Sequence, residues 1–297
     1  MKVETYAAID IGSNAIRMLV ANVLTPKEGP TQFHKNALVR VPIRLGQDAF
    51  GTGEISKKNY KRLRRAMKAF KHIMKIHKVH HFSACATAAL REATNGEQVQ
   101  ESIQKETGIF IDIIDGKKEA SLISHTRIFD QITTQKTVLY VDVGGGSTEY
   151  SILRNGTCIA SKSFKIGTVR LLNKTVAKTI WSEIQKWIES QKLEYSKITV
   201  LGSGGNINKL FKIAGVKEGK PLSYVALSAL YTKIAGYSYE ERMLHFQLNP
   251  DRADVILPAA TIYLKTLLWA GASKIYVPKI GLSDGMIKEM YYNMNER

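Results

Sequence analysis

The chain has 297 residues, of which 44% are hydrophobic and 23% are charged, enough apolar material for a core and for two domains of ordinary size. This composition excludes a disordered chain, a collagen and a small disulfide scaffold. With 43 Lys and Arg against 26 Asp and Glu, the formal net charge is +17. The surface therefore attracts anions, which could be nucleic acid, an anionic membrane face or a phosphate-rich small molecule.

Cysteine usage and the N-terminal sequence predict a cytoplasmic protein. Cys85 and Cys158 occur in no CxxC or Cys/His spacing, so neither a disulfide framework nor a zinc site is indicated, and a reducing compartment suits them. Glu4 and Asp10 interrupt the region where a signal peptide needs an apolar run. The most apolar stretch, residues 255–272, contains a proline and a lysine, and we interpret it as a buried helix rather than a membrane span.

In the first part of the chain, the apolar run 6–11, the polar turn 12–14 and the strand-like run 16–23 predict a hairpin with a glycine at its tip. Ser56 can cap a helix whose apolar residues recur every three or four positions, and its Lys and Arg face is interpreted as solvated. An alternating α/β pattern follows. It comprises a strand at 81–84, helices near 88–93 and 97–107, and a strand at 109–114.

The second part repeats this plan. An apolar strand over 138–143 leads into the glycine-rich turn 144–148, a second strand over 149–153 follows, and Asn155-Gly156 signals a further hairpin into 157–163. A strand at 198–201 then enters Gly-Ser-Gly-Gly at 202–205 and a helix, and a strand at 275–277 leads through 281–285 into a final helix. The chain is therefore predicted to consist of two related halves packed across a cleft.

The two turns combine the residue types that bind phosphate. Each places an aspartate, Asp10 or Asp142, at a strand end and glycines in the turn that follows. Glycines let backbone N–H groups approach phosphate oxygens, hydroxyls add donors, and a carboxylate at the rim can hold a divalent cation or orient water. The turn residues expected to bind substrate phosphates are Gly12, Ser13, Asn14, Gly144, Gly145, Gly146, Ser147 and Thr148, with Gly204 from the third glycine-rich segment.

Taken together, these motifs resemble the exopolyphosphatase and guanosine pentaphosphate phosphohydrolase family. The matching segments are Asp-Ile-Gly-Ser-Asn at 10–14, Thr-Ala-Ala-Leu-Arg-Glu-Ala at 87–93, Asp-Val-Gly-Gly-Gly-Ser-Thr-Glu at 142–149, and Gly-Leu-Ser-Asp-Gly at 281–285. The resemblance implies an α/β fold with two ribonuclease-H-like domains of the actin-like ATPase superfamily around a central cleft. We expect domains at residues 1–118 and 119–297, in the short form of the family, with the last helix free to pack back on the first domain.

The resemblance also implies roles for four carboxylates. Glu119 matches the general base that activates the attacking water, and Asp142 is expected to be catalytic with it. Asp142 and Glu149 match acidic positions associated with Mg²⁺ and with the lytic water, Mn²⁺ could substitute for Mg²⁺, and Asp10 is a further candidate ligand. Without the resemblance, the preferred interpretation of Glu119 is a first-turn glutamate favoured by the helix dipole, and that of Glu149 is an exposed strand carboxylate. Asp10 could instead brace its own turn.

Basic side chains complete the implied site. Arg44 and Arg91 match positions near the substrate phosphates, where a guanidinium donates two parallel hydrogen bonds. One stretch departs from the family pattern, because Asp115-Gly116-Lys117-Lys118 stands where a serine and an acidic residue are common. We hypothesise that Lys117 or Lys118 contacts substrate or changes the pKa of Glu119.

The function expected from the residues and the resemblance is exopolyphosphatase activity, which releases terminal orthophosphate from inorganic polyphosphate by attack of water. Guanosine pentaphosphate phosphohydrolase is the alternative with the same chemistry, an actin-like kinase would need an acceptor hydroxyl, and a non-catalytic polyphosphate or alarmone sensor would bind without hydrolysis. The sequence has no nucleic-acid module signature, so neither a nucleic acid polymer nor a membrane is the expected partner, and the resemblance is compatible with a homodimer.

Overall fold

The computed structural model describes residues 1–124, 126, 137–155, 157–194 and 198–295. The chain forms two compact units, one of Met1–Thr126 with Gly281–Arg297 and the other of Arg127–Ile280. The sequence placed a boundary between residues 118 and 119 and allowed the last helix to return to the first domain. In the structure, the first unit continues to Thr126 and contains that last helix.

The first unit is built on a five-stranded sheet in the order β3-β2-β1-β4-β5. β1 and β2 pair antiparallel along their whole length, and β4 and β5 add in parallel. Every second residue of β1 faces the same side of the sheet, so Tyr6 and Ala8 face one side and Ala7 and Ile9 the other. The strands are β1 (Lys2–Ile11), β2 (Ile16–Thr25), β3 (Gln32–Val41), β4 (His81–Ala86) and β5 (Asp112–Ile113).

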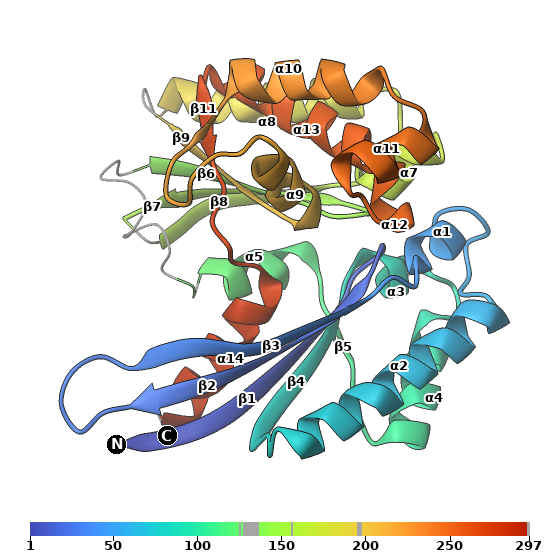
Figure 1. Ribbon diagram of the computed structural model, residues 1–297, viewed down its shortest axis with the longest axis vertical. Coiled ribbons are helices and arrows are strands. Elements are labelled where there is room, and N and C mark those ends of the chain that lie inside the picture. Colours follow the sequence, from blue (N-terminus) through green and yellow to red (C-terminus); the bar gives the residue numbers. More distant parts are fainter. Residues whose placement is uncertain (125, 127–136, 156, 195–197, 296–297) are drawn as a thin grey trace. The chain divides into compact units, whose positions relative to one another are not determined.

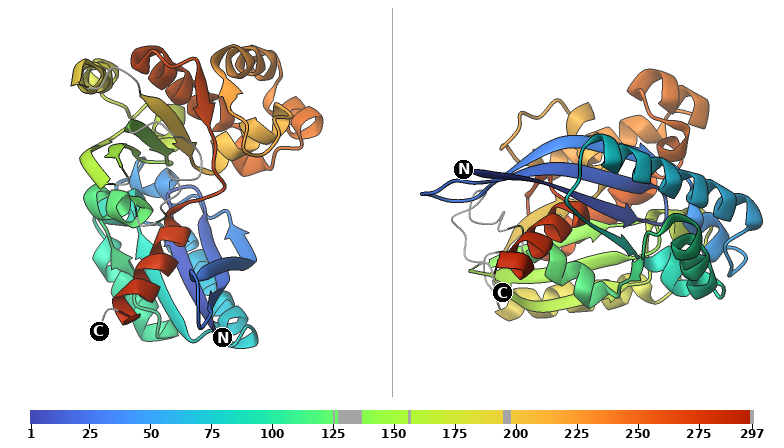
Figure 2. Two further views of the ribbon diagram at one scale, coloured as in Figure 1. Left: turned by 90° about the vertical axis from the view of Figure 1, so that its left-hand side faces the viewer. Right: turned by 90° about the horizontal axis from the view of Figure 1, so that it is seen from below.

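Helices cover both faces of this sheet. Tyr6 and Ala8 pack in one cluster with Leu122 of α5 and Met286 of α14, and Figure 1 shows α14 lying along β1 beside α5. Figure 2 shows α2 and α4 on the other face. The Ser56 hydroxyl accepts from the backbone N–H of Asn59, which caps α2 as predicted. The helices are α1 (Leu45–Ala49), α2 (Lys57–Ile76), α3 (Ala88–Glu92), α4 (Gly96–Thr107), α5 (Gly116–Ser124) and α14 (Leu282–Asn295).

The second unit has a six-stranded sheet in the order β10-β11-β9-β6-β7-β8. Leu139, Val141 and Tyr150 face one side of it and pack against helices that include α8 and α13. The strands are β6 (Thr137–Val143), β7 (Thr148–Arg154), β8 (Thr157–Phe164), β9 (Thr199–Ser203), β10 (Leu222–Ser223) and β11 (Lys274–Tyr276). The helices are α7 (Thr168–Leu172), α8 (Ile180–Glu194), α9 (Gly205–Ile213), α10 (Tyr224–Ala235), α11 (Tyr239–Phe246), α12 (Pro250–Ala253) and α13 (Ile256–Ala270).

The apolar stretch near the C-terminus forms a core helix. The segment Pro250–Ala270 is long and apolar enough to cross a membrane by composition, and 56% of its most apolar window is buried inside the structure. Ile256, Ile262 and Tyr263 of α13 are completely buried in the core of the second unit. The prediction of a buried helix at residues 255–272 is therefore confirmed.

The two units share one plan. In each, a long antiparallel hairpin continues into a third strand, and parallel strands extend the sheet beyond the first strand, so β1, β2, β3, β4 and β5 correspond to β6, β7, β8, β9 and β11. This confirms the predicted repetition and the ribonuclease-H-like α/β fold of both units. The prediction of a strand over 109–114 was too long, because β5 covers only Asp112–Ile113, and Gly156 of the predicted hairpin lies outside the described residues.

Candidate active site

The hairpin tips of the two units close in the same way. The backbone N–H of Gly12 donates to the carbonyl of Ala15 at 3.2 Å, and the backbone N–H of Gly144 donates to the carbonyl of Ser147 at 3.0 Å. Each turn follows the strand that carries its aspartate, Asp10 or Asp142. The two predicted phosphate turns are therefore structural counterparts.

In the second unit, a row of polar residues crosses four strands. Asp142 pairs with Glu149, Glu149 with Ser163, and Asp142 with Ser203, so the four residues stand side by side across β8, β7, β6 and β9. Paired residues share a face of the sheet, and this face is opposite to that of Val141 and its helical core. The predicted pairing of Asp142 and Glu149 across the turn is therefore present in the register.

Hydroxyl groups surround the two carboxylates of this row. Ser147 and Ser163 donate to Oε1 of Glu149 at 2.5 and 3.0 Å, and Ser203 donates to Oδ2 of Asp142 at 3.4 Å. Glu149 is only 3% exposed. It is therefore a buried, hydrogen-bonded carboxylate, and the alternative of an exposed strand glutamate is wrong.

The turn of the second unit is held from one side by the segment that follows β8. The carbonyls of Gly144 and Gly145 accept from the backbone N–H groups of Thr168 and Val169, and Nε of Arg170 donates to the carbonyl of Gly146 at 2.6 Å. In a trans peptide the N–H points opposite to the carbonyl. The N–H groups that follow these three carbonyls therefore point away from the supporting segment, the arrangement of an anion-binding nest.

Some predicted phosphate donors use their hydroxyls inside the protein. Oγ1 of Thr148 donates to the carbonyl of Ile166 at 2.6 Å, and Ser147 donates to Glu149. In these contacts both hydroxyls stabilise the turn. Gly204 has φ +115°, and a Cβ there would lie 3.0 Å from the carbonyl of Val143, so the close approach of β9 to the turn requires glycine.

The corresponding row of the first unit differs in charge. Asp10 pairs with Arg17, Arg17 with Arg40, and Asp10 with Cys85. Oδ2 of Asp10 lies 3.7 Å from Arg17. Burial raises the pKa of Asp10, and the Arg17 guanidinium opposes that shift. Arg17 thus stands where the second unit has Glu149.

The turn of the first unit is also held from one side. The carbonyl of Ser13 accepts from the N–H of Gly46 at 2.7 Å, and that of Asn14 accepts from the N–H of Arg44 at 3.0 Å. Arg44 has φ 63°, a left-handed conformation that directs the chain into α1. A Cβ at Gly46 would lie 2.8 Å from the Cβ of Ser13. The predicted residues Ser13, Asn14 and Arg44 are therefore brought together.

Glu119 lies in the first turn of α5, on the sheet face that also carries Asp10. The Asp115 carboxylate accepts from the N–H of Lys118 at 2.8 Å and caps the helix. Arg91 donates to the carbonyl of Ile114 at 2.7 Å, directly before that cap. Glu119 is 8% exposed, and this burial is unlike that of a solvated first-turn glutamate.

The departure from the family pattern has a structural role. Asp115 replaces the usual serine as a helix cap, and the Lys118 ammonium forms an ion pair with Glu289 of α14. Lys118 therefore joins α5 to α14. The hypothesis that Lys117 or Lys118 acts on substrate or on Glu119 stays a prediction.

The structure thus groups the predicted residues by unit: Asp10, Arg44, Arg91 and Glu119 belong to the first, and Asp142, Glu149 and Gly204 to the second. The cleft expected between the halves stays a prediction. Sequence reasoning missed Arg17, Ser163 and Ser203. The seven-residue spacing that pairs Asp142 with Glu149 also separates Asp10 from Arg17 and could have identified Arg17.

Known proteins match nearly the whole chain. The model of the Ppx/GppA phosphatase family matches residues 32–294. Exopolyphosphatase 2 of Mycobacterium tuberculosis is 24% identical over 282 residues, which cover 86% of this chain and 88% of that protein.

Solved structures of similar proteins match the chain as well. The crystal structure of the Aquifex aeolicus member of the Ppx/GppA family has a TM-score of 0.77 and 26% identity, covering 99% of both chains. An exopolyphosphatase from Cytophaga hutchinsonii has a TM-score of 0.84, 21% identity and 98% coverage of both chains, which shows the same fold. The repeated fold, the two glycine turns and the family match over most of the sequence together show that the chain belongs to the Ppx/GppA phosphatase family.

Proposed function

We propose that this protein is an exopolyphosphatase that releases terminal orthophosphate from inorganic polyphosphate in the cytoplasm. The observation that carries the proposal is the row of Asp142 and Glu149 beside a turn whose N–H groups face away from their support, within a chain of the Ppx/GppA family. The nest binds phosphate oxygens, and the net charge of +17 favours a polyanionic substrate.

Glu119 is proposed as the general base. It accepts the proton of a water that attacks the terminal phosphorus, the P–O bond to the remaining chain breaks, and the shortened chain leaves with its terminal oxygen. Arg91 and Arg44 would hold substrate phosphates, because guanidinium groups donate two parallel hydrogen bonds to phosphate oxygens.

The carboxylates Asp142 and Glu149 fit Mg²⁺. They are adjacent on one sheet face, and the described residues contain no cluster of three or more His, Cys, Asp or Glu side chains that could hold a metal by themselves. Mg²⁺ commonly binds through one or two carboxylates with substrate phosphates and water completing the octahedron. When bound, Mg²⁺ or Mn²⁺ would neutralise charge on the phosphates. Asp10 is engaged with Arg17, and its role as a further ligand is part of the proposal.

The test measures Mg²⁺-dependent phosphate release from long-chain polyphosphate and from guanosine pentaphosphate. Glu119→Gln is compared with Glu97→Gln, which changes an exposed glutamate in the first turn of α4 and so controls for the loss of a helix-dipole interaction. We expect release from polyphosphate to be lost in Glu119→Gln only. Preferential release from the nucleotide would replace the proposal by the pentaphosphate alternative, and binding without release in the parent would indicate a sensor.

A further inference from the structure

Helix α2 carries a basic surface for which the proposed active site gives no use. The helix contains nine Lys or Arg residues and no acidic residue over Lys57–Ile76. Its apolar side chains, Leu63, Met67 and Phe70, are buried in the first unit. The residues on the opposite side form an exposed line that we call the α2 stripe: Lys57, Lys61, Arg65, Lys68, His72 and Lys75.

The stripe is long and regularly spaced. At a rise of 1.5 Å per residue, it extends for about 27 Å. Its members follow one another at intervals of three or four residues, so they lie on one side of the helix. Like charges at these intervals destabilise a helix. The stripe therefore lowers the stability of α2 unless an anion neutralises it.

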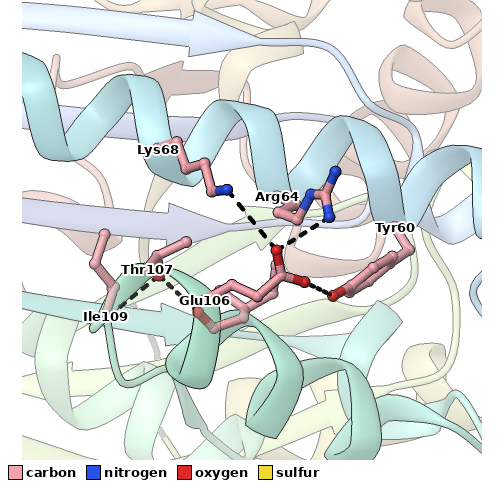
Figure 3. A network of polar contacts seen from close by, with 7 residues as sticks. Tyr60, Arg64, Lys68, Glu106, Thr107 and Ile109 are labelled. Carbon is pink, nitrogen blue, oxygen red and sulfur yellow. Dashed lines mark hydrogen bonds and ion pairs between the residues drawn. The ribbon is translucent and has the colours of Figure 1, made fainter.

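Few protein carboxylates reach this surface. In the described part of the chain, the ion pairs of α2 all go to Glu106 of α4, which lies 3.0 Å from Arg64 and 3.8 Å from Lys68 (Figure 3). Tyr60 also donates to Glu106 at 2.7 Å, and this hydrogen bond lowers the pKa of Glu106. Glu106 thus fastens one flank of α2 to α4 and pairs with one member of the stripe, Lys68.

The N-terminal end of α2 is joined to the phosphate turn of the same unit. Arg62 donates to the carbonyls of Pro42 and Ile43 at 2.6 and 3.0 Å. The next residue, Arg44, donates its N–H to the carbonyl of Asn14 in the turn. Residues 42–44 therefore connect α2 directly to the turn of the proposed phosphate site.

The residue types on the stripe distinguish among anionic partners. It has no Phe, Tyr or Trp side chain on which successive bases could stack, as single-stranded nucleic acid binding uses, and its one imidazole, His72, stands among five Lys and Arg residues. Most apolar side chains of α2 are buried, and Ile76 at its C-terminal end is the exposed one among its large hydrophobic residues, which is far less than the apolar face of a helix that lies in a lipid surface. Ammonium groups on flexible stems match an anion that is charged along its length and lacks bases or acyl chains.

We propose that the α2 stripe is a docking track for the distal part of a long polyphosphate chain, whose terminal phosphate lies at the active site. This inference rests on the proposed function for the identity of the anion. It implies that long chains bind more tightly than short ones, because only long chains reach from the phosphate turn along α2.

The experiment measures binding directly, so its result does not depend on hydrolysis. Long-chain polyphosphate and tripolyphosphate are titrated into the full-length protein over a range of salt concentrations in the presence of EDTA. The test variant is Lys61→Gln/Arg65→Gln/Lys75→Gln, which leaves Arg62 and the Glu106 contacts in place. The control, Lys178→Gln/Lys186→Gln/Lys220→Gln, removes three exposed charges from the second unit.

We expect the α2 variant to bind long chains at least about tenfold more weakly at 0.1 M salt, with the slope of log K against log salt flatter by about 2, as loss of three phosphate contacts requires. Binding of tripolyphosphate should not change. Unchanged binding of long chains, or an equal loss in the control variant, would overturn the proposal. The proposal would also be overturned if single-stranded DNA bound the parent more tightly than polyphosphate of equal charge and this binding required the same residues.

Two further measurements distinguish a folding defect of the variant, a failure of the proposed function and a failure of the docking proposal. Gln has a helix propensity close to that of Lys and Arg, and the variant has fewer like charges at intervals of three or four residues, so its melting temperature should equal or exceed that of the parent. The double variant Lys61→Gln/Arg65→Gln provides a second, smaller change. If the parent releases no phosphate from any chain, the proposed function fails, and the salt dependence of binding still tests the track. If release occurs, KM for long chains should rise in the variant while kcat stays the same.

Discussion

Ser163 shows how a single hydroxyl positions a proposed metal ligand. It lies on β8 beside Glu149 and donates to Oε1 at 3.0 Å. Outer-shell hydrogen bonds of this kind orient ligands, and their loss commonly weakens metal binding by about 10- to 100-fold. We therefore expect Ser163→Ala to raise the Mg²⁺ concentration for half-maximal phosphate release by about tenfold. Ser161→Ala, an exposed change two residues earlier on β8, should leave it unchanged, and equal effects would contradict this role.

The buried thiol of Cys85 should make the folding stability of the protein fall at alkaline pH. The thiol is 6% exposed beside Asp10, and burial first, then nearby carboxylates, raise its pKa from 9.0 to about 12. Because the folded pKa is the higher one, the unfolded chain loses this proton first as pH rises, and stability is lost above the unfolded value. From pH 9 to pH 10 we expect Cys85 to account for a loss of about 1 kcal/mol.

Urea unfolding of the parent and of Cys85→Ala at the two pH values measures this effect. The difference between the proteins should shrink at pH 10, because the variant lacks the titrating group. Cys158→Ala serves as the comparison, because burial also raises the pKa of this half-buried thiol and the same effect should be present in a weaker form. A constant difference between the parent and Cys85→Ala across the pH range would show that the Cys85 thiol does not titrate in this way.

The cap of α5 positions the proposed base. Asp115 accepts from the N–H of Lys118, and loss of such a cap costs about 1 kcal/mol. Asp115→Ala should lower the free energy of unfolding by about that amount and reduce kcat, because Glu119 lies in the first turns of the released helix. Asp115→Ser keeps a capping oxygen and should retain both. If Ala and Ser behave alike in denaturation and in kinetics, the cap is not what positions Glu119.

Gly167 belongs to the segment that supports the phosphate turn of the second unit, and it leaves no room for a larger side chain. A Cβ at Gly167 would lie 2.4 Å from the backbone carbon and oxygen of Gly145, so Gly167→Ala must displace the turn or α7. We expect this variant to raise KM for polyphosphate strongly while both units stay folded. Gly281→Ala is the matched control, because a Cβ there meets nothing within 4 Å and its φ is ordinary. Equal KM values in the two variants would contradict the role given to the support.

The first unit depends on the C-terminal helix α14 for its fold. Leu282, Met286, Ile287 and Tyr291 of α14 are buried against the sheet and α5. Burial of each such side chain stabilises by roughly 1.5–3 kcal/mol, and a typical domain has a net stability of only about 5–15 kcal/mol. Removal of residues 281–297 should therefore unfold the first unit.

Limited proteolysis of the truncated chain tests this dependence. Cleavage should spread over the first unit, whereas the core of the second unit stays protected, because its buried residues belong to its own sheet and helices. Addition of a peptide of residues 281–297 should restore part of the protection. A truncated chain as resistant as the parent would show that α14 does not stabilise the first unit.

The elements and the repeated plan could be predicted from the sequence, because hydrophobic periodicity and glycine turns are local signals. Residues 6–23 and 138–163 have the spacing of hairpins, and Ser56 caps α2 as its pattern predicts. The sequence pattern was least informative for β3 and for the short strands β5 and β10, because packing in the sheet outweighs the local preference of the residues there.

Which side chains stand together became clear from the folded structure. The alignment of Ser203 with Asp142, of Ser163 with Glu149 and of Arg17 with Asp10 depends on strand register, which a linear pattern does not specify for distant strands. The return of α14 to the first unit likewise depends on an apolar face that the sheet leaves to be covered. The residues that identify the family are thus readable along the chain, whereas their neighbours across the sheet are decided by burial and by hydrogen bonding between strands.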